Sequence, residues 1–333
     1  MLRASIAAGI AVLPLFALMA STAGATAQRT FVSVTGLDTN ACSVTAPCRS
    51  FAAALAQATA GGEIIVVDSG GYGPVVINKP VSIAAPSGVY AGVSVFSGTG
   101  ISVNPGSGVV TLTGLTINGV GGAIGIQFLS GDNLTLNNII VSGMTASGVY
   151  GRVPGSVSIN DSAFLNNGTV INDGGINLST SSGTLAVNVA RSRFDGNYTG
   201  MFLLDNVKGV VEDSIVRRSI YAAGYIQTGT VGAPTRVTIQ RCTVSANLYG
   251  LFFGFLSGDP TVVEVTDSEL SDNVGSAVYM ETQGTAYFSN TKITRHGDGI
   301  DISTFGGTAI SFKDNLVYSN GGMEVFSSTL LKK

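Results

Sequence analysis

A repeat of about 25 residues runs through most of this chain and limits the folds that it can adopt. The clearest copy is Val157 to Leu178, V-S-I-N-D-S-A-F-L-N-N-G-T-V-I-N-D-G-G-I-N-L. Val157 and Ile159 alternate with polar residues, as expected for a strand with one buried face. Phe164 returns to the core after a bend, and Gly175 opens a second strand. Each copy therefore predicts one turn of a coil that is built from short strands.

Apolar residues equivalent to Phe164 recur at intervals of roughly 22 to 30 residues, which is the range of solenoid repeats. They are Ile117, Val141, Phe194, Val216, Val244, Leu270, Ile293 and Val317. A small polar residue stands two positions before most of these markers, and asparagine often stands three positions after them. The two columns are Ser162, Ser192, Ser214, Ser268 and Thr291, and Asn167, Asn197, Asn247, Asn273 and Asn320. We expect both columns to stack from coil to coil, with Cys242 as a buried, inert substitute for serine.

Two repeat architectures have this period, the leucine-rich repeat and the parallel β-helix. The internal leucine position is mostly Ser or Thr here, and the repeats contain no helix-forming segment. A second strand that begins with glycine recurs in every coil, as in Gly175-Ile176. Glycine is also very frequent (45 of 333 residues) and charged residues make up only 11%, which favours many short strands and tight turns. We therefore predict an all-β, parallel β-helix.

The first 27 residues have the pattern of a secretory signal peptide. Arg3 supplies the positive start, Ile6 to Ala20 the apolar run, and Ala25-Thr26-Ala27 a small-residue cleavage site. A retained anchor would have a similar pattern, but the run contains Pro14 and is short for a membrane span. We expect cleavage and export to the periplasm or to the outside of the cell, and no later stretch is apolar enough to cross a bilayer.

Residues 28–62 are expected to form an N-terminal unit ahead of the β-helix, which we place at 63–333. Cys42 and Cys48 enclose a short loop and are predicted to form a disulfide in an oxidising compartment. The Ala-rich segment from Ser50 to Ala60 is the one strongly helical stretch after the signal. A helix there would cover the open end of a solenoid, so we predict an N-terminal helical cap.

These N-terminal residues also resemble a known family. The Ala-rich helix, Gly61-Gly62-Glu63-Ile64-Ile65-Val66-Val67, Gly71-Tyr72-Gly73 and Val81-Ser82-Ile83 resemble the entry into the β-helix of the pectin-lyase-like superfamily. The chain is similar to secreted bacterial β-helix repeat proteins that have no assigned reaction. The resemblance implies a single-stranded right-handed parallel β-helix, but its motifs specify architecture and not chemistry.

Reactions in that superfamily are mostly polysaccharide cleavage, so an enzyme would be a polysaccharide lyase or a glycoside hydrolase. Gly297-Asp298-Gly299-Ile300-Asp301 resembles part of the polygalacturonase motif, in which paired carboxylates act as acid and base. The rest of that motif is missing, and Asp301 also fits the outward position of a glycine-led strand. The candidate catalytic residues are Asp298, Asp301 and His296, with Lys313 as a further option.

His296 is the single histidine of the chain, but it falls in the asparagine column, where a solvated turn residue is the alternative. Arg152-Val153-Pro154 resembles part of a pectate lyase signature, although Val157 stands where its second arginine is expected. No cluster of His, Cys and carboxylates has the spacing of a metal site, so neither a metal nor a cofactor is expected.

Outward positions of the glycine-led strands should form one row along the wall, because coils stack at about 4.8 Å. The row expected is Gln127, Tyr150, Asn177, Phe202, Ile226, Phe252, Tyr279, Asp301 and Glu324. Its aromatic members predict an exposed apolar patch on which sugar rings would stack. The predicted ligand-binding residues are Tyr150, Asn177, Phe202, Phe252 and Tyr279. A loop folded over the row, or pairing of two chains through it, are the alternatives.

The sequence thus predicts an exported protein, in the periplasm or at the cell surface, that interacts with a polysaccharide or a cell-surface glycan and lacks a complete catalytic motif. A divergent polysaccharide lyase or glycosidase and a structural or adhesive, self-associating protein remain as alternatives. The formal net charge of −3 gives no electrostatic reason to expect nucleic acid or an anionic membrane surface as the partner.

Overall fold

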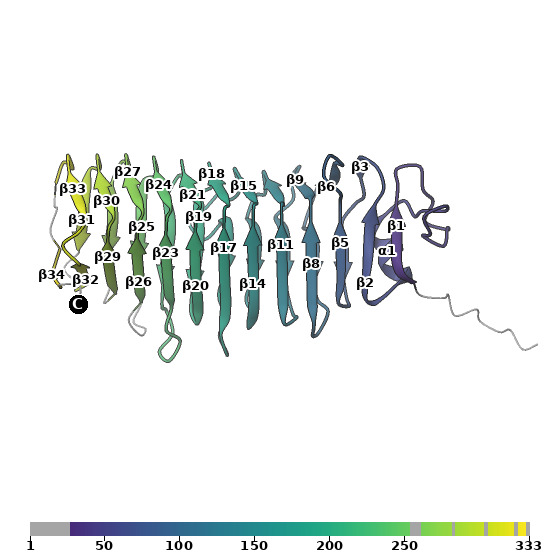
Figure 1. Ribbon diagram of the computed structural model, residues 1–333, viewed down its shortest axis with the longest axis horizontal. Helices are drawn as coiled ribbons and strands as arrows, with labels where there is room; N and C mark the ends of the chain where they lie inside the picture. Colours follow the sequence, from purple (N-terminus) through teal and green to yellow (C-terminus); the bar gives the residue numbers. More distant parts are fainter. Residues whose placement is uncertain (1–26, 254–260, 282–283, 303–305, 323–325, 331–333) are drawn as a thin grey trace, which may run out of the picture.

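The computed structural model describes residues 27–253, 261–281, 284–302, 306–322 and 326–330. Residues 1–26 of the predicted signal and Glu324 of the predicted row lie outside this part of the chain. The described residues form three parallel β-sheets, which we call sheets A, B and C, wound into one elongated solenoid (Figure 1). The predicted parallel β-helix is therefore confirmed.

The strands of sheet A are β1 (Ala27–Val32), β2 (Ala58–Val66), β5 (Val81–Ala84), β8 (Val109–Thr113), β11 (Asn133–Asn137), β14 (Gly155–Asn160), β17 (Leu185–Ala190), β20 (Val207–Glu212), β23 (Arg236–Gln240), β26 (Val262–Thr266), β29 (Thr285–Ser289), β32 (Thr308–Ser311) and β34 (Ser328–Thr329).

The strands of sheet B are β3 (Gly70–Gly71), β6 (Ala91–Val95), β9 (Leu115–Gly119), β12 (Ile140–Ser142), β15 (Ala163–Leu165), β18 (Arg193–Asp195), β21 (Ile215–Arg217), β24 (Thr243–Ser245), β27 (Glu269–Ser271), β30 (Lys292–Thr294) and β33 (Leu316–Tyr318). Those of sheet C are β4 (Val75–Ile77), β7 (Thr99–Val103), β10 (Ile124–Phe128), β13 (Ser147–Gly151), β16 (Gly174–Leu178), β19 (Thr199–Leu204), β22 (Ala222–Gln227), β25 (Tyr249–Phe253), β28 (Ser276–Met280) and β31 (Asp298–Ile302).

From β2 to β33 the chain visits sheets A, B and C in turn, and every strand that is not at the end of its sheet pairs in parallel with the equivalent strands of the coils before and after it. Val157, for example, pairs with Leu134 on one side and Val187 on the other. Equivalent corner residues are 22 positions apart between Ser192 and Ser214 and 30 apart between Ser162 and Ser192. Inward side chains such as Val157 are fully buried, and they form one continuous core along the axis.

The corner between sheets A and B depends on the predicted serine column. The residue before each serine takes a left-handed conformation, as Asp161 does with φ of 52°. This single left-handed residue turns the chain from the sheet A strand toward the sheet B strand. Ser162 Oγ accepts the N–H of Ile139 from the preceding coil at 3.0 Å and donates to Asn160 O at 2.7 Å. The Ser162 N–H in turn donates to Ser192 Oγ at 3.1 Å.

Cys242 occupies the same corner position and behaves as the serines do. Its Sγ lies 3.3 Å from Gln240 O, and its N–H donates to Ser268 Oγ at 3.1 Å. Burial raises the pKa of the thiol to about 11, so the nucleophilic thiolate is scarce at neutral pH. This placement agrees with the predicted role of a buried, inert thiol.

The corner between sheets B and C carries the asparagine column. Asn167 Oδ1 accepts the Met144 N–H at 3.1 Å, and its Nδ2 donates to Val141 O at 3.1 Å. Asn197 Oδ1 accepts both the N–H and Nδ2 of Asn167 at 3.0 Å. Each asparagine therefore binds backbone groups that the parallel ladders leave unpaired at the corner, as buried polar groups require.

Ser219 interrupts this asparagine column. Its N–H donates to Asn247 Oδ1 at 2.9 Å, as an asparagine there would, but its own Oγ is buried without a partner. A serine side chain is shorter than that of asparagine and does not span the distance to the next coil. The column is therefore incomplete at one coil near the middle of the solenoid.

Glycine is the second residue of most sheet C strands, and at Gly175 it has a steric cause. A Cβ on Gly175 would lie 2.6 Å from Cδ1 of Phe194 and 2.5 Å from Gly200 O. Because real side chains do not approach that closely, the strand passes over the buried ring only as glycine. The recurrent glycine is therefore a packing requirement of the coil and not a sign of a ligand site.

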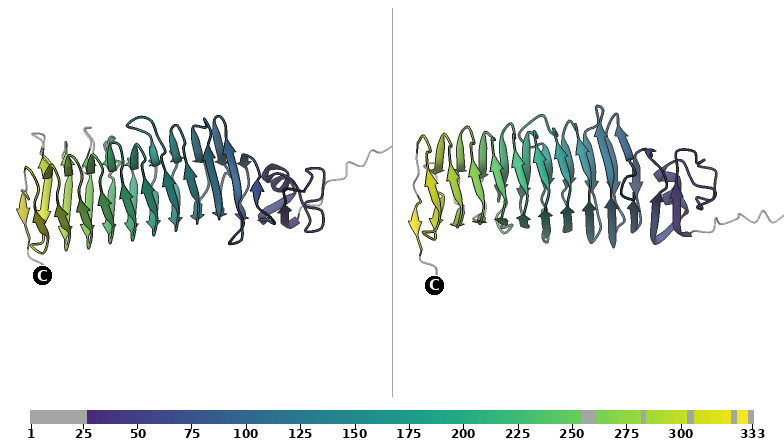
Figure 2. Two further views of the ribbon diagram at one scale, coloured as in Figure 1. Left: turned by 90° about the horizontal axis from the view of Figure 1, so that it is seen from above. Right: turned by 45° about the horizontal axis from the view of Figure 1, so that its top comes forward.

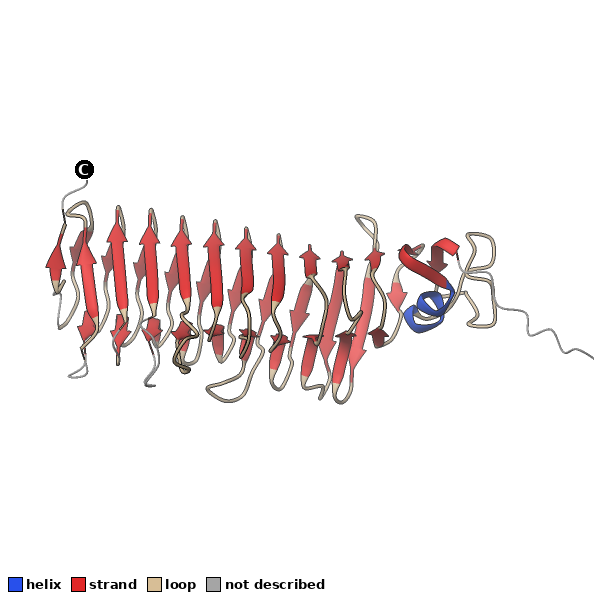
Figure 3. Ribbon diagram, turned by 90° about the horizontal axis from the view of Figure 1, so that it is seen from below, coloured by secondary structure: helices blue, strands red, loops and turns tan. Residues whose placement is uncertain are grey.

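The helix α1 (Phe51–Gln57) lies at the N-terminal end of the solenoid (Figures 2 and 3), and it follows β1 and precedes β2 in the sequence. It is shorter than the predicted Ser50–Ala60, because Ala58 leaves the helix and pairs with Ala27 of β1. Ser50 is its N-cap and accepts the Ala53 N–H at 3.2 Å. Cys42 and Cys48 form a disulfide in the loop before it.

We predict that Asn273→Ala lowers the free energy of unfolding by about 2 kcal/mol, because the N–H and Nδ2 of Asn247 would lose their buried acceptor. We expect Ser219→Asn to raise it by about 1 kcal/mol, since the asparagine column would be completed. Urea denaturation measures both changes. Asn188→Ala, on the exposed face of β17, is the control and should change stability by no more than about 0.5 kcal/mol. Equal effects of the three substitutions would contradict the role of the column.

Candidate functional site

The predicted outward row exists on sheet C, with one change of membership. Strand pairing places in register Gln127, Tyr150, Asn177, Phe202, Tyr225, Phe252, Tyr279 and Asp301, which we call the sheet C strip. Ile226 was predicted for this row, and that prediction is wrong. Tyr225 pairs with Phe202 and Phe252, while Ile226 is buried in the core. The strip therefore holds one more aromatic ring than expected.

Four rings of the strip stack on one another along the solenoid axis. The ring centroids are 4.6 Å apart for Phe202 and Tyr225, 5.0 Å for Tyr225 and Phe252, and 5.0 Å for Phe252 and Tyr279. A second row, Tyr198, Tyr221 and Tyr249, packs beside them, with Tyr221 and Tyr249 5.1 and 5.2 Å from Phe252. We call these seven residues the aromatic cluster.

This packing overturns the prediction of an exposed apolar patch. The exposed fraction is 5% for Phe202, 3% for Phe252 and 2% for Asn177. Their faces are occupied because neighbouring coils place the next ring about one strand spacing away. The tyrosines of the cluster, by contrast, are half-buried. What the cluster offers to solvent is thus part of its tyrosine side chains, while the phenylalanine rings are closed off.

The phenol groups of Tyr221, Tyr225 and Tyr279 stay protonated over the whole physiological range. Burial raises the pKa of Tyr225 to about 12, and the carboxylate of Glu281 adds to the effect. Burial likewise raises the pKa of Tyr221 and of Tyr279, with Glu281 contributing to both. Each phenol O–H can therefore donate one hydrogen bond and accept another.

Carboxylates stand at the C-terminal end of the strip. Asp301 follows Tyr279 in the row, and Asp298 begins the same strand, β31. Burial raises the pKa of Asp301, and the charge of Asp298 raises it further. The two predicted catalytic carboxylates are thus brought close enough to interact, and Glu281 adds a third acidic group that sequence reasoning missed.

His296 and Lys313 are not part of this acidic end. His296 is 5% exposed and takes an asparagine position in the corner column, where Nδ1 accepts the Asn273 N–H at 3.1 Å and Nε2 lies 2.9 Å from Leu270 O. Both ring nitrogens are therefore engaged with the backbone, which argues against a general base and against a solvated turn residue. Lys313 lies at the corner between sheets A and B, with φ of 67°.

Polar groups mark the N-terminal half of the strip. The guanidinium of Arg152 lies 4.9 Å from the centre of the Tyr150 ring and donates to Ser179 Oγ at 2.7 Å. Asn177 Nδ2 donates to Asn172 O at 2.5 Å, and its Oδ1 is buried without a partner. Arg152 is therefore held against the strip by Tyr150 and Ser179, and this position does not depend on the incomplete pectate lyase signature.

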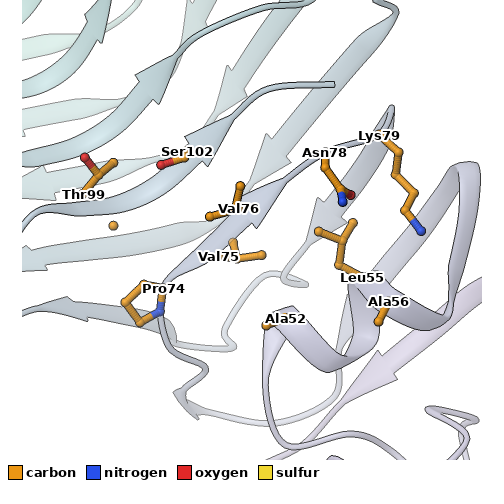
Figure 4. A pocket seen from close by; sticks show the side chains of 11 residues that line it. Ala52, Leu55, Ala56, Pro74, Val75, Val76, Asn78, Lys79, Thr99 and Ser102 are labelled. Carbon is orange, nitrogen blue, oxygen red and sulfur yellow. The ribbon is translucent and has the colours of Figure 1, made fainter. Parts of the chain in front are cut away.

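A pocket of about 570 Å³ lies where α1 meets the first strands of sheet C (Figure 4). Leu55 of α1 and Val76 of β4 line it, together with Ser102, which pairs with Val76 and with Gln127 of the strip. Lys79 at its rim donates to Ala58 O at 2.8 Å. The residues that line the pocket come from separate segments between Ala52 and Ser102, so no local sequence motif predicted it.

Within the described ranges, no group of three or more His, Cys, Asp or Glu side chains is arranged to hold a metal ion. Over the same residues, none of the helices has the length and apolar character needed to span a bilayer.

Comparison with known proteins agrees with this architecture. A family model described as "Right handed beta helix region" matches residues 99–263, from β7 into β26. No curated protein matches the chain. The family match and the sheet topology together define the class: the chain is a right-handed parallel β-helix protein, as its N-terminal residues led us to expect.

Solved structures of similar fold include a pectate lyase, Pel9A, with a TM-score of 0.53 and 16% identity over 92% of this chain and 79% of that one. The GH136 lacto-N-biosidase from Eubacterium ramulus has a TM-score of 0.50 and 10% identity over 91% and 67%. XylC in complex with xylose has a TM-score of 0.54 and 8% identity over 83% and 70%. At these identities the likeness is one of fold alone.

The placement of His296 predicts a pH-dependent stability. Burial holds the pKa of His296 below its usual value of about 6.5, so the unfolded chain binds the proton more readily. The neutral state of His296 therefore stabilises the fold fully above about pH 6.5, and this stabilisation is lost as the pH falls below that value, by at most about 1.4 kcal/mol per pH unit.

His296→Asn should fold with similar stability at pH 7.5, because asparagine fills this position in other coils, and should lack that loss. Urea denaturation of both proteins at pH 7.5 and 5.5 measures the difference. Carboxylates titrate in both proteins alike, so the wild type serves as the matched control. An identical pH dependence in the two proteins would contradict the buried, neutral state of His296.

Proposed function

We propose that the protein binds a glycan along the sheet C strip, through phenol hydroxyl groups and carboxylates. The observation that carries this proposal is the arrangement of six half-buried tyrosines beside three carboxylates on one wall of the solenoid. They are Tyr150, Tyr198, Tyr221, Tyr225, Tyr249 and Tyr279, with Glu281, Asp298 and Asp301.

The chemistry of these groups suits sugar hydroxyls, which need donors and acceptors side by side. A protonated phenol supplies both, and an ionised carboxylate accepts up to four hydrogen bonds. Because the coils repeat at about 4.8 Å, an extended chain lying along the axis would meet the same kind of contact repeatedly. The proposal differs from the sequence-based one in the contacts with the sugar. Phenol hydroxyl groups would bind the sugar hydroxyls, whereas stacking of sugar rings on aromatic faces is no longer expected, since those faces pack against other rings.

The names of the structurally similar proteins support the ligand class. One is a pectate lyase, one is a lacto-N-biosidase, and one was observed with xylose. These names describe those proteins, and the low identities transfer only the fold. A glycan is nonetheless the ligand class that the strip and these proteins have in common.

We propose further that the protein is exported, to the periplasm or to the cell surface. The signal-like pattern of residues 1–27 supports this, and so does the disulfide between Cys42 and Cys48, which persists in oxidising compartments.

The glycan proposal predicts that Tyr225→Phe combined with Tyr279→Phe weakens binding by about tenfold, because two hydroxyl contacts are removed. Stacking should survive, since Phe202 and Phe252 hold equivalent places in the same row. Affinity electrophoresis against a panel of neutral and acidic polysaccharides identifies the ligand, and titration calorimetry measures the loss.

Tyr287→Phe is the matched control, because Tyr287 is a half-buried tyrosine on sheet A. Retention of every polysaccharide by the double variant at wild-type strength would refute the strip as the binding site. Release of reducing ends or unsaturated products by the wild type, abolished in Asp301→Asn, would instead establish the enzyme alternative, for which the raised pKa of Asp301 beside Asp298 is the supporting observation. Concentration-dependent elution in size-exclusion chromatography, without glycan binding, would favour the self-associating alternative.

For the N-terminal unit, residues 28–62, we propose that α1 caps the solenoid. The helix takes the place that a sheet C strand would have between β1 and β2, and it packs against β4, the first strand of that sheet. Phe51, Ala54 and Leu55 face the protein, and the Phe51 ring lies 5.2 Å from the buried Tyr72 ring. A helix has no unpaired strand edge, so it would end the sheet without offering a template for pairing.

Leu55→Asp should therefore lower the free energy of unfolding by about 3 kcal/mol, because it buries a charge in the cap. It should also produce early-eluting oligomers in size-exclusion chromatography. Ala52→Asp, on the exposed side of the same helix, is the control and should leave both measurements near their wild-type values. A stable Leu55→Asp variant that elutes like the wild type would contradict the capping role.

A further inference from the structure

Three arginines converge on one buried carboxylate on sheet B. Asp195, in β18, is 1% exposed in its side chain. Arg193 contacts Asp195 Oδ2 through Nη2 and donates to it from Nε at 3.0 Å. Arg217 Nε donates to the same oxygen at 3.0 Å, and Arg218 Nε donates to Oδ1 at 2.6 Å. A single anion thus holds three cations from two adjacent coils.

The carboxylate is charged at every physiological pH. Burial raises the pKa of Asp195, but the hydrogen bonds from Arg218, Arg193 and Arg217 outweigh burial and lower the pKa to about 2. With one negative and three positive charges, the cluster carries a formal surplus of two positive charges. That surplus is local, since the whole chain has a formal net charge of −3.

The guanidinium groups keep hydrogen-bond capacity for an outside partner. Each has five N–H groups. Arg217 and Arg218 use only Nε toward Asp195, and within the described residues no other hydrogen bond engages their terminal nitrogens. Their side chains are 42% and 61% exposed. Two forks of terminal N–H groups are therefore held in place by a buried anchor and face solvent.

Other arginines of the corners are neutralised. Arg191 makes a bidentate pair with Asp161, Arg241 binds Asp213 and Glu212, and Arg295 makes a bidentate pair with Asp272. Arg295 stands at the same left-handed corner position as Arg218 and is similarly exposed. Arg295 has a carboxylate of its own, Asp272, whereas Arg218 shares Asp195 with two other arginines. An excess of positive charge therefore distinguishes the Asp195 cluster from the other corners.

We propose that Arg193, Arg217 and Arg218 form an oxyanion-binding site for the sulfate or carboxylate groups of an acidic glycan. A planar fork of N–H groups matches the oxygen spacing of such anions, and an arriving anion relieves the mutual repulsion of the three cations. Arg218 lies at the corner between sheets B and C, three residues before Tyr221 of the aromatic cluster. The site is nevertheless separate from the sheet C strip, so it goes beyond the proposed function and requires none of its contacts.

The test uses the complete chain and dextran sulfate, with uncharged dextran as the matched polymer and inorganic sulfate as the free ion. Titration calorimetry should show binding of dextran sulfate but not of dextran, and added NaCl should weaken it. The double variant Arg217→Gln/Arg218→Gln should bind dextran sulfate at least about tenfold more weakly. Inorganic sulfate bound as tightly per group, with the same loss in the variant, would also support the site and would identify a free oxyanion as its ligand.

Arg295→Gln removes one positive charge from the equivalent corner position and should leave dextran sulfate binding unchanged. The single variant Arg218→Gln keeps Arg193 and Arg217 on Asp195, so it separates a loss of binding from a loss of folding, which thermal denaturation checks. The proposal is refuted if the wild type binds neither dextran sulfate nor sulfate, or if Arg295→Gln weakens binding as much as the double variant. The tyrosine variants of the strip are expected to bind dextran sulfate normally, so the two sites can fail independently.

Discussion

The structure depends on hydrogen bonds between side chains at the corners and the backbone of the neighbouring coil. Parallel strands satisfy their own N–H and C=O groups, but the bend between two sheets leaves such groups without a ladder partner. The serine and asparagine columns supply that partner: Ser162 binds the Ile139 N–H, and Asn167 binds the Met144 N–H. A solenoid whose corners lacked these columns would bury unpaired polar groups at every turn.

The corner columns also fix where every outward side chain stands. Because each corner residue binds its counterpart one coil away, loops of different length change the wall without shifting the register of the strands. Sheet C accordingly keeps one row from Gln127 to Asp301 although the connecting loops vary. The same registration brings Arg193 and Arg217, 24 positions apart in the sequence, onto one carboxylate. Both proposed sites are therefore consequences of the repeat, which places side chains of neighbouring coils on one surface.

Much of this fold could be predicted from the sequence, because the constraint that shapes each coil repeats. Phe164, Ser162 and Asn167 recur with their equivalents at fixed offsets, and all three columns are present in the structure. Where a coil departed from the pattern, the prediction failed. In β22, Ala223 takes the place of the leading glycine and the glycine stands one position later, at Gly224. The outward position was accordingly assigned one residue too late, to Ile226 and not to Tyr225. The burial of the strip was also missed, because the second row of tyrosines comes from the first residue of a strand, as Tyr249 does, or from the residue just before one, as Tyr198 and Tyr221 do.

Side-chain clusters that cross coils are harder to predict, because no local spacing encodes them. Asp195 looks like an ordinary outward residue in the sequence, and Arg217-Arg218 like a solvated pair. Only the register shows that the three arginines share one carboxylate while Arg295, at an equivalent corner, has its own. The repeat allows each wall to carry a different chemistry: phenols and carboxylates on sheet C, surplus guanidinium on sheet B. Because Arg218 stands three residues before Tyr221, a long acidic glycan bound to both proposed sites would place its anionic groups on the arginines of sheet B and its hydroxyls on the tyrosines of sheet C, across the corner between the two sheets.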